Sequence, residues 1–355
     1  MTVDEEGFQY PAIDEKKCIS CHKCEKVCAF VKEFNISDNN DVPDVYAANG
    51  GGVDVSPSSS SAGVGNALAK AFIHSGGIVY GVGFDDDFVV KHIRLDAVED
   101  VFRIDGSKYV QSNLDGVFES IEVDLNNERK VLFFGTACQT AGLYSFISNK
   151  KHIDNLYLVD VLCHGVPSPG VFKDYLQFAS QNKKSGIKSV VFRSKVNGWI
   201  SAVSGQKIVF ENGKEMRMSL FSKLFFGHYI LRPSCNQCVY TRLNKPSDMT
   251  LADFWRIREY DPSMYTSDGV SMVLVNSSKG KYLFDLVNNV FSIKKMEVSC
   301  CDAAQFKKPA SFNPDRDKFF LDYKTLGSSK TLKKYQHIFF VKSIEKKIVN
   351  VIKKG

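Results

Sequence analysis

Four cysteines near the amino terminus have the spacing of an iron-sulfur ligand set. They follow the pattern C-x2-C-x2-C-x3-C and are Cys18, Cys21, Cys24 and Cys28. Such a run places three thiolates on one tight loop and the fourth at the start of the next helix, where they can wrap a cubane 4Fe-4S cluster. Zinc sites more often pair two C-x2-C knuckles across a longer loop, so zinc is the weaker alternative. The run predicts one-electron chemistry.

The fourth ligand of this first cluster is left open by the sequence. Ala29 follows Cys28 where such runs usually continue with proline, and the run occurs only once. In proteins with two runs, the fourth cysteine of each ligates the other cluster. Either Cys28 closes its own cluster or a distant residue supplies the ligand. Cys300 and Cys301 are expected to be free thiols, the alternative being that one of them is that distant ligand.

A second group of cysteines lies in tight loops further along the chain. Cys138 and Cys163 each follow a predicted strand in corresponding strand-loop-helix units, so both loops are expected at one edge of a sheet. Cys235 and Cys238 form a C-x2-C knuckle. A lone cysteine is most often a small buried apolar residue. Four in such loops predict a second 4Fe-4S cluster.

Composition describes an ordinary globular chain. Its 355 residues are 44% hydrophobic and 24% charged, which suits two or three domains. No apolar run reaches membrane-spanning length, and residues 1–11 lack the features of a secretory signal, so we expect a cytoplasmic protein without a membrane span. The formal charge of +6 comes largely from lysines near the carboxyl end. They alternate with apolar residues at helical spacing, which favours a helix packed on its own domain over contact with nucleic acid or lipid.

Strands alternate with helices through the middle of the chain. Apolar runs predict strands over 78–82, 89–95, 130–134, 155–162, 249–254 and 270–275, and helices over 66–73, 139–147, 172–178 and 281–290. Strands at 189–193, 207–210 and 215–218 look antiparallel, with Asn212-Gly213 as a hairpin turn. The pattern predicts an α/β fold with a mixed sheet and α+β character in the C-terminal part, preceded by a small ferredoxin-like N-terminal segment.

Several motifs carry a resemblance to a known family. They are Gly135-Thr136-Ala137-Cys138-Gln139, residues 160–169, and Cys235-Asn236-Gln237-Cys238-Val239-Tyr240 with residues 248–255. They resemble the coenzyme F420 hydrogenase/dehydrogenase beta-subunit family, and matches at 58–63, 76–81 and 107–112 extend the likeness over nearly the whole chain. The resemblance implies a ferredoxin-type segment over 1–40, family domains over 41–128 and 129–345, and a basic tail over 346–355.

What the resemblance implies for function is an iron-sulfur flavoprotein oxidoreductase. Its cofactors would be one or two 4Fe-4S clusters, FAD and, at the substrate side, coenzyme F420. Electrons would pass between a reduced carrier, such as ferredoxin or F420, and an organic substrate. The alternative is an electron-transfer subunit that feeds a partner enzyme and has no substrate of its own. A third possibility is a zinc-stabilised binding module.

The same resemblance suggests particular site residues. The second cysteine group carries over as a 4Fe-4S site. Residues implied to bind the flavin are Ser60, Ser61, Gly63, Ser107, Lys108, Tyr109, Gln139 and Arg242, with Lys108 and Arg242 as partners of the flavin phosphates. His164 is the candidate catalytic residue, able to donate a hydrogen bond to the cluster or to shuttle a proton near the flavin; an ordinary loop-capping histidine is the alternative.

Overall fold

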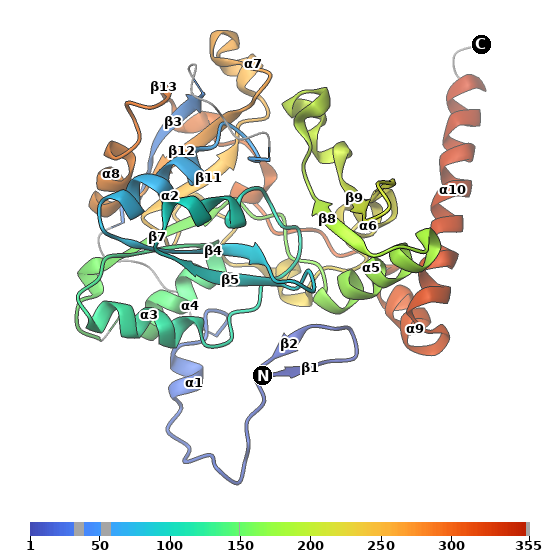
Figure 1. Ribbon diagram of the computed structural model, residues 1–355, viewed down its shortest axis with the longest axis horizontal. Helices are drawn as coiled ribbons and strands as arrows, with labels where there is room; N and C mark the ends of the chain where they lie inside the picture. Colours follow the sequence, from blue (N-terminus) through green and yellow to red (C-terminus); the bar gives the residue numbers. More distant parts are fainter. Residues whose placement is uncertain (32–38, 51–57, 149, 353–355) are drawn as a thin grey trace.

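An eight-stranded mixed sheet is the centre of the larger part of the molecule (Figure 1). The computed structural model describes residues 1–31, 39–50, 58–148 and 150–352. Across the sheet the strands are β13 (Ser292–Met296), β3 (Asp44–Asn49), β12 (Val270–Val275), β11 (Met249–Asp253), β7 (Leu156–Val161), β6 (Val131–Thr136), β4 (Ile78–Phe84) and β5 (Val90–Leu95). Neighbours among β4, β6, β7 and β11 are parallel, and the outer pairs are antiparallel. The predicted mixed-sheet α/β fold is confirmed.

Helices cover both faces of this sheet because its central strands are apolar on both sides. Leu132 packs on one face beneath α2 (Val64–His74) and α8 (Ser278–Asp285). Its neighbours Val131 and Phe133 point the other way, toward α3 (Val117–Asn126) and α4 (Ala137–Ile147). This alternation follows from the two-residue repeat of a strand.

A smaller part packs beside the large sheet and is rich in aromatic residues. Its antiparallel sheet contains β8 (Ile187–Val191), β9 (Lys207–Phe210) and β10 (Glu215–Arg217). Four helices surround the core that this sheet shares: α5 (Pro169–Lys183), α6 (Ser219–Phe226), α9 (Arg316–Leu326) and α10 (Ser328–Ile352). None of the helices in the described part of the chain combines the length and apolar character needed to cross a membrane.

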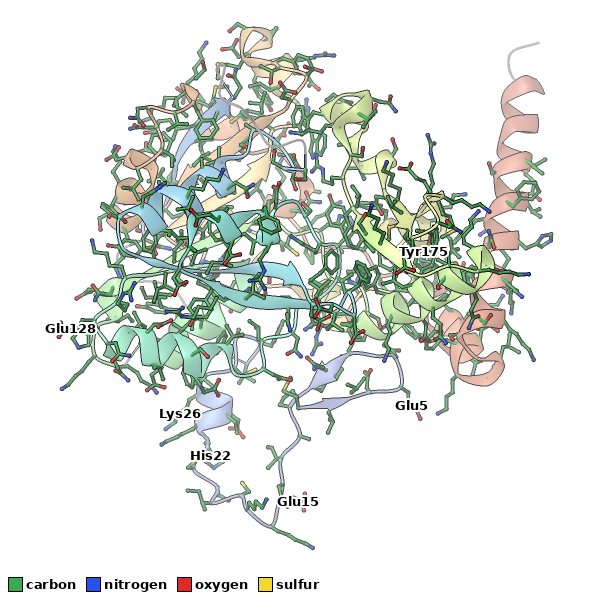
Figure 2. The ribbon with its side chains drawn as sticks, in the orientation of Figure 1. Glu5, Glu15, His22, Lys26, Glu128 and Tyr175 are labelled. Carbon is green, nitrogen blue, oxygen red and sulfur yellow. The ribbon has the colours of Figure 1, made fainter. Side chains whose placement is uncertain are left out.

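The amino-terminal segment folds back on this smaller part. The hairpin of β1 (Thr2–Val3) and β2 (Gln9–Tyr10) is held by Arg316, which pairs with the Glu6 carboxylate. The Arg232 guanidinium lies 4.1 Å from the centre of the Tyr10 ring and donates to the Gln9 carbonyl. Beyond the hairpin, the cysteine loop and α1 (Lys23–Lys26) extend away from the body, as the positions of Glu15, His22 and Lys26 show (Figure 2).

Several elements differ from the sequence-based expectation. The stretch after residue 290 was expected to be irregular, which is wrong: it contains β13 and α9. Cys28 was expected to begin a helix, but α1 contains Cys24 and ends before Cys28. The edge strand β3 and the helix α3 were not predicted. α10 runs through residue 345, and the end of the predicted basic tail, residues 353–355, lies outside the described residues. The remaining helix is the short α7 (Ile257–Tyr260).

His92 makes stability depend on pH. It is buried in β5, its ring stacks on Phe133 and its Nε2–H donates to the Phe134 carbonyl at 2.9 Å. Burial lowers the pKa of His92 to about 4. Below pH 6.5 the unfolded chain therefore binds a proton that the folded chain excludes, and between pH 6.5 and 5 stability should fall by about 2 kcal/mol.

The matched variant for this prediction is His92→Gln, whose amide can donate to the same carbonyl without titrating. Urea unfolding of both proteins at pH 6.5 and 5 should show a steeper loss for the natural chain. Equal losses would mean that His92 is protonated without penalty in the folded state.

Candidate functional site

Two cysteines lie at the same edge of the large sheet because β6 and β7 are adjacent and parallel. Cys138 is in the first turn of α4, directly after β6, and Cys163 lies two residues beyond β7. An antiparallel bridge between Pro167 and Leu231 then brings the η5 turn (Pro233–Gln237), with its C-x2-C knuckle, against the Cys163 loop. The structure thus gathers all four cysteines of the second group from three separate segments.

Backbone groups point at the sulfur atoms of this four-cysteine site. The Gly165 amide donates to Cys163 Sγ at 3.3 Å, and the Val166 amide donates to Cys235 Sγ at 3.5 Å. Gly165 has a φ of +128°, and a β-carbon there would lie 3.4 Å from the Cys235 β-carbon. Glycine at this position lets the loop approach the knuckle closely in a conformation that side chains disfavour.

The thiols of the four-cysteine site need positive charge to ionise. Burial is the main cause that raises the pKa of Cys163, with neighbouring Cys235 and Cys138 adding to it. Burial likewise raises the pKa of Cys138, and that of Cys235 to about 12. Bound iron would supply the missing charge, so donor type, number and environment fit a cluster.

Gathering thiols for a cluster differs from gathering them for one ion. Among the residues that the structure describes, no three His, Cys, Asp or Glu side chains are arranged to hold a metal ion. One zinc ion would draw four sulfurs to within roughly 4 Å of each other, whereas each thiolate of a cubane binds its own iron. The 4Fe-4S assignment therefore stays a prediction.

The first cysteine group lies on the extended amino-terminal loop. Cys18, Cys21 and Cys24 are exposed and Cys28 is half-buried. Ser20 and His22, between them, adopt left-handed backbone conformations with φ of 53° and 55°. Such residues tighten a loop at some energetic cost, which is commonest at functional sites. Within the described ranges these cysteines are not drawn together around one ion either, so their ligand role stays a prediction as well.

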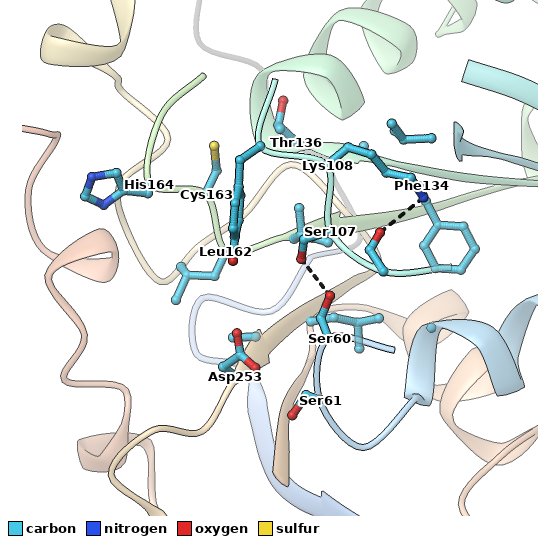
Figure 3. Close-up of a pocket in the computed structure, with 18 of the residues that line it drawn as sticks. Ser60, Ser61, Ser107, Lys108, Phe134, Thr136, Leu162, Cys163, His164 and Asp253 are labelled. Atoms are coloured by element: carbon cyan, nitrogen blue, oxygen red, sulfur yellow. Dashed lines mark hydrogen bonds between the residues drawn. The ribbon is translucent and has the colours of Figure 1, made fainter. Parts of the chain in front are cut away.

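A cavity of about 450 Å³ opens beside the four-cysteine site. It lies where β6, β7 and β11 end and where α2 and α4 begin. All the predicted flavin-binding residues except Arg242 line it: Ser60, Ser61, Gly63, Ser107, Lys108, Tyr109 and Gln139. Cys163 and His164 line it too, so the cavity and the four-cysteine site share a wall (Figure 3). Arg242 does not line the cavity, and its Nε donates to the Asn244 carbonyl.

The serine loop, residues 58–63, is fixed in place from two directions. Ser60 and Ser107 share a hydrogen bond of 2.6 Å between their hydroxyls (Figure 3). Lys195 donates to the Ser59 hydroxyl and to the Ser61 carbonyl, both at 3.1 Å. Lys195 comes from a separate segment more than 130 residues away, and no local signal in the sequence points to it.

Lys108 has a structural role in the cavity wall. Its ammonium donates to the backbone carbonyls of Asp105 and Gly106 at 2.8 and 3.2 Å. Burial lowers the pKa of Lys108 to about 8, with the Asp105 charge opposing the shift. Gln139 is similarly used, because its Oε1 accepts from the Thr136 amide at the start of α4 and its Nε2 donates to Ser112. Both residues therefore shape the cavity whether or not they touch a ligand.

His164 belongs to a pair of histidines with defined tautomers. His228 Nδ1–H donates to the Ser311 carbonyl at 2.7 Å, so in the neutral pair His228 Nε2 accepts from His164 Nε2–H at 2.9 Å. His164 Nδ1 then accepts from the Gln305 amide at 3.2 Å. Burial, with a contribution from His228, lowers the pKa of His164. No pattern in the sequence indicates His228 or Gln305 as its partners.

The opposite wall of the cavity contains an ion pair beneath tryptophan. Buried Arg193 donates to Asp253 at 2.5 Å, and Trp199 Nε1–H donates to the same carboxylate at 3.0 Å. Trp255 stacks on Trp199 at 4.8 Å between ring centres, and Arg193 lies 4.9 Å from the Trp255 ring. Asp253 and Trp255 line the cavity. This wall is rigid and aromatic, which suits a flat organic ligand.

Fold and site together describe an α/β protein with a four-cysteine site and an organic-ligand cavity at one sheet edge. Residues 128–299 match the family described by the C terminus of the coenzyme F420 hydrogenase/dehydrogenase beta subunit, and this part of the chain belongs to it. The resemblance seen in the motifs is thereby confirmed. A chain in a structure of the F420-reducing [NiFe] hydrogenase complex from Methanosarcina barkeri is similar at 14% identity, covering 85% of this chain and 94% of that one, with a TM-score of 0.49. No curated protein matches.

Proposed function

We propose that this protein is an iron-sulfur flavoprotein oxidoreductase, which passes electrons between a reduced carrier, such as ferredoxin or coenzyme F420, and an organic substrate. The observation that carries the proposal is the loop of residues 161–166, which supplies Cys163 to the four-cysteine site and also lines the cavity. A redox-active ring in the cavity would lie directly beside the cluster ligands. The family match over 128–299 supports the same interpretation.

The protein's own residues would bind and orient such a cofactor. Ser60, Ser61 and Ser107 offer hydroxyl groups, and α2 begins at Gly63 with its amino-terminal backbone amides near the cavity. Serine hydroxyls and a helix amino terminus suit the phosphates of FAD. His164 would hold a proton on Nε2, one hydrogen bond from His228. When bound, the flavin would supply the exchange between two-electron and one-electron chemistry.

An electron-transfer subunit without its own substrate is the second candidate, and the exposed amino-terminal loop favours it. Ile19 is 83% exposed and Val31 is 69% exposed, beside the cysteines of that loop. Exposed apolar side chains of this kind are typical of surfaces that meet a partner protein. The two candidates are separated by turnover with a reduced carrier: product formed by the isolated chain rules out a pure subunit.

The proposal is tested by anaerobic purification with iron, sulfide and flavin analysis. Two cubanes predict about eight irons per chain, with equal acid-labile sulfide, and one cubane predicts about four. One flavin per chain is expected beside them. A colourless preparation that contains zinc and lacks sulfide would instead identify a zinc-stabilised module.

A substitution in the cavity separates flavin binding from cluster binding. Ser60→Tyr places a phenol ring in the cavity, so flavin content should fall at least about tenfold while iron is unchanged. Ser120→Tyr, on the exposed side of α3, is the matched control and should keep its flavin. Equal flavin content in the two variants would place the cofactor outside this cavity.

A further inference from the structure

The amino-terminal cysteine loop contacts the four-cysteine site at one place. Ala29 is 7% exposed and packs with Ala137, Ala141 and Tyr240 in a small cluster, against which Cys138 and Cys238 are packed. Tyr240 is 1% exposed, and its hydroxyl donates to the Ala29 carbonyl at 2.7 Å. The residue next to Cys28 is therefore held by the residue two positions beyond Cys238.

Small side chains on α4 make this contact close. A β-carbon at Gly142 would lie 3.9 Å from the Ala29 β-carbon, so α4 presents almost bare backbone to the loop. Ser145, one turn further on, donates to the Lys26 carbonyl at 3.3 Å. By contrast, Cys18, Cys21 and Cys24 are exposed to solvent. The loop is thus fixed at its Cys28 end, on the helix that carries Cys138.

We infer that Tyr240 is a positioning residue that holds Cys28 against the four-cysteine site and so defines a route for single electrons between two clusters. The inference rests on the proposed function, because it needs a cluster at each cysteine group. The route runs from Cys28 through one peptide to the Ala29 carbonyl, across the hydrogen bond to Tyr240, and along two residues to Cys238.

The transfer along this route is simple to balance. An external one-electron reductant first reduces the cluster on the exposed loop. One electron then leaves that cluster, which is oxidised, and reaches the inner cluster, which is reduced. No covalent bond forms or breaks, and Tyr240 keeps its proton. Because tunnelling weakens steeply with distance, a fixed short contact sets the rate.

The inference is tested by Tyr240→Phe, which keeps the ring and removes the hydroxyl. Iron, sulfide and flavin should stay at the level of the natural chain. In the dithionite-reduced protein, the magnetic interaction between the two cluster spins should weaken in electron paramagnetic resonance spectra. Amides of residues 26–29 should exchange hydrogen about five- to tenfold faster, as loss of one hydrogen bond predicts.

Two further variants keep the test decisive. Tyr323→Phe, on the far helix α9, loses a hydroxyl bond to Asp174 and should leave both spectra and exchange unchanged. Ala29→Leu, which keeps Tyr240 but wedges the loop away from α4, should weaken the spin interaction even if Tyr240→Phe fails to fold. An unchanged spin interaction in both Tyr240→Phe and Ala29→Leu overturns the route. Only one cluster in the natural chain would overturn the two-cluster function itself.

Discussion

Replacing Cys163 with alanine should halve the iron and acid-labile sulfide, from about eight to about four atoms of each per chain. The expected loss is large because Cys163 is the most central thiol of its site: its charge interacts with those of Cys138, Cys235 and Cys238. The three remaining cysteines cannot complete a cubane. Metal analysis of anaerobically purified protein, together with the visible spectrum, measures the effect.

Two other cysteines provide the comparison. Cys300 is buried in an apolar cluster with Phe306 and Met272, so Cys300→Ala should keep the full iron content. Cys24→Ala should remove the other half of the iron, since Cys24 lies on the amino-terminal loop. Full iron in Cys163→Ala would show that the four-cysteine site holds no cluster, and full iron in Cys24→Ala would show the same for the loop.

Replacing Gly280 with alanine should lower the free energy of unfolding by about 3–5 kcal/mol, which is among the largest effects of a single methyl group. A β-carbon at Gly280 would lie 1.9 Å from the Asp248 carbonyl oxygen, so α8 must move away from β11. That movement strains a buried network. Asp248 accepts from the Leu158 amide and from the Ser277 hydroxyl, both at 2.7 Å.

Urea unfolding at neutral pH gives the measurement, and Gly65→Ala gives the control. Gly65 is in the first turn of α2, where a β-carbon would lie 3.5 Å from Leu251, an ordinary contact. Alanine there should change stability by less than about 1 kcal/mol, in the favourable direction that helix propensity predicts. A similar small change for Gly280→Ala would mean that α8 shifts without resistance.

The parts of the site that sequence could predict are those made by short segments. Cys138 and Cys163 each follow a buried strand directly, so their common edge follows from the rule for parallel strands. The C-x2-C knuckle is likewise a local pattern. The strand at 270–275 has its predicted bounds because all six of its residues are buried and apolar or small.

The parts that sequence could not predict depend on distant contacts. The Lys195 contacts with the serine loop, the Arg193–Asp253 pair and the His164–His228 pair join segments 60 or more residues apart. Their residue types are common on ordinary surfaces, so only the fold distinguishes them. β13 was missed for a related reason: as an edge strand with two lysines, it lacks the apolar run of a buried strand.

The position of β3 constrains how the chain can be made. β3 ends at Asn49, yet its two neighbours in the sheet, β12 and β13, begin at Val270 and Ser292. During synthesis at about 5–20 residues per second, β3 waits roughly 10–45 s before its first partner exists. Until then a mostly buried, apolar strand has both edges open, which invites pairing with other nascent chains. High yield of this protein should therefore depend on chaperone supply and on slow, cool expression.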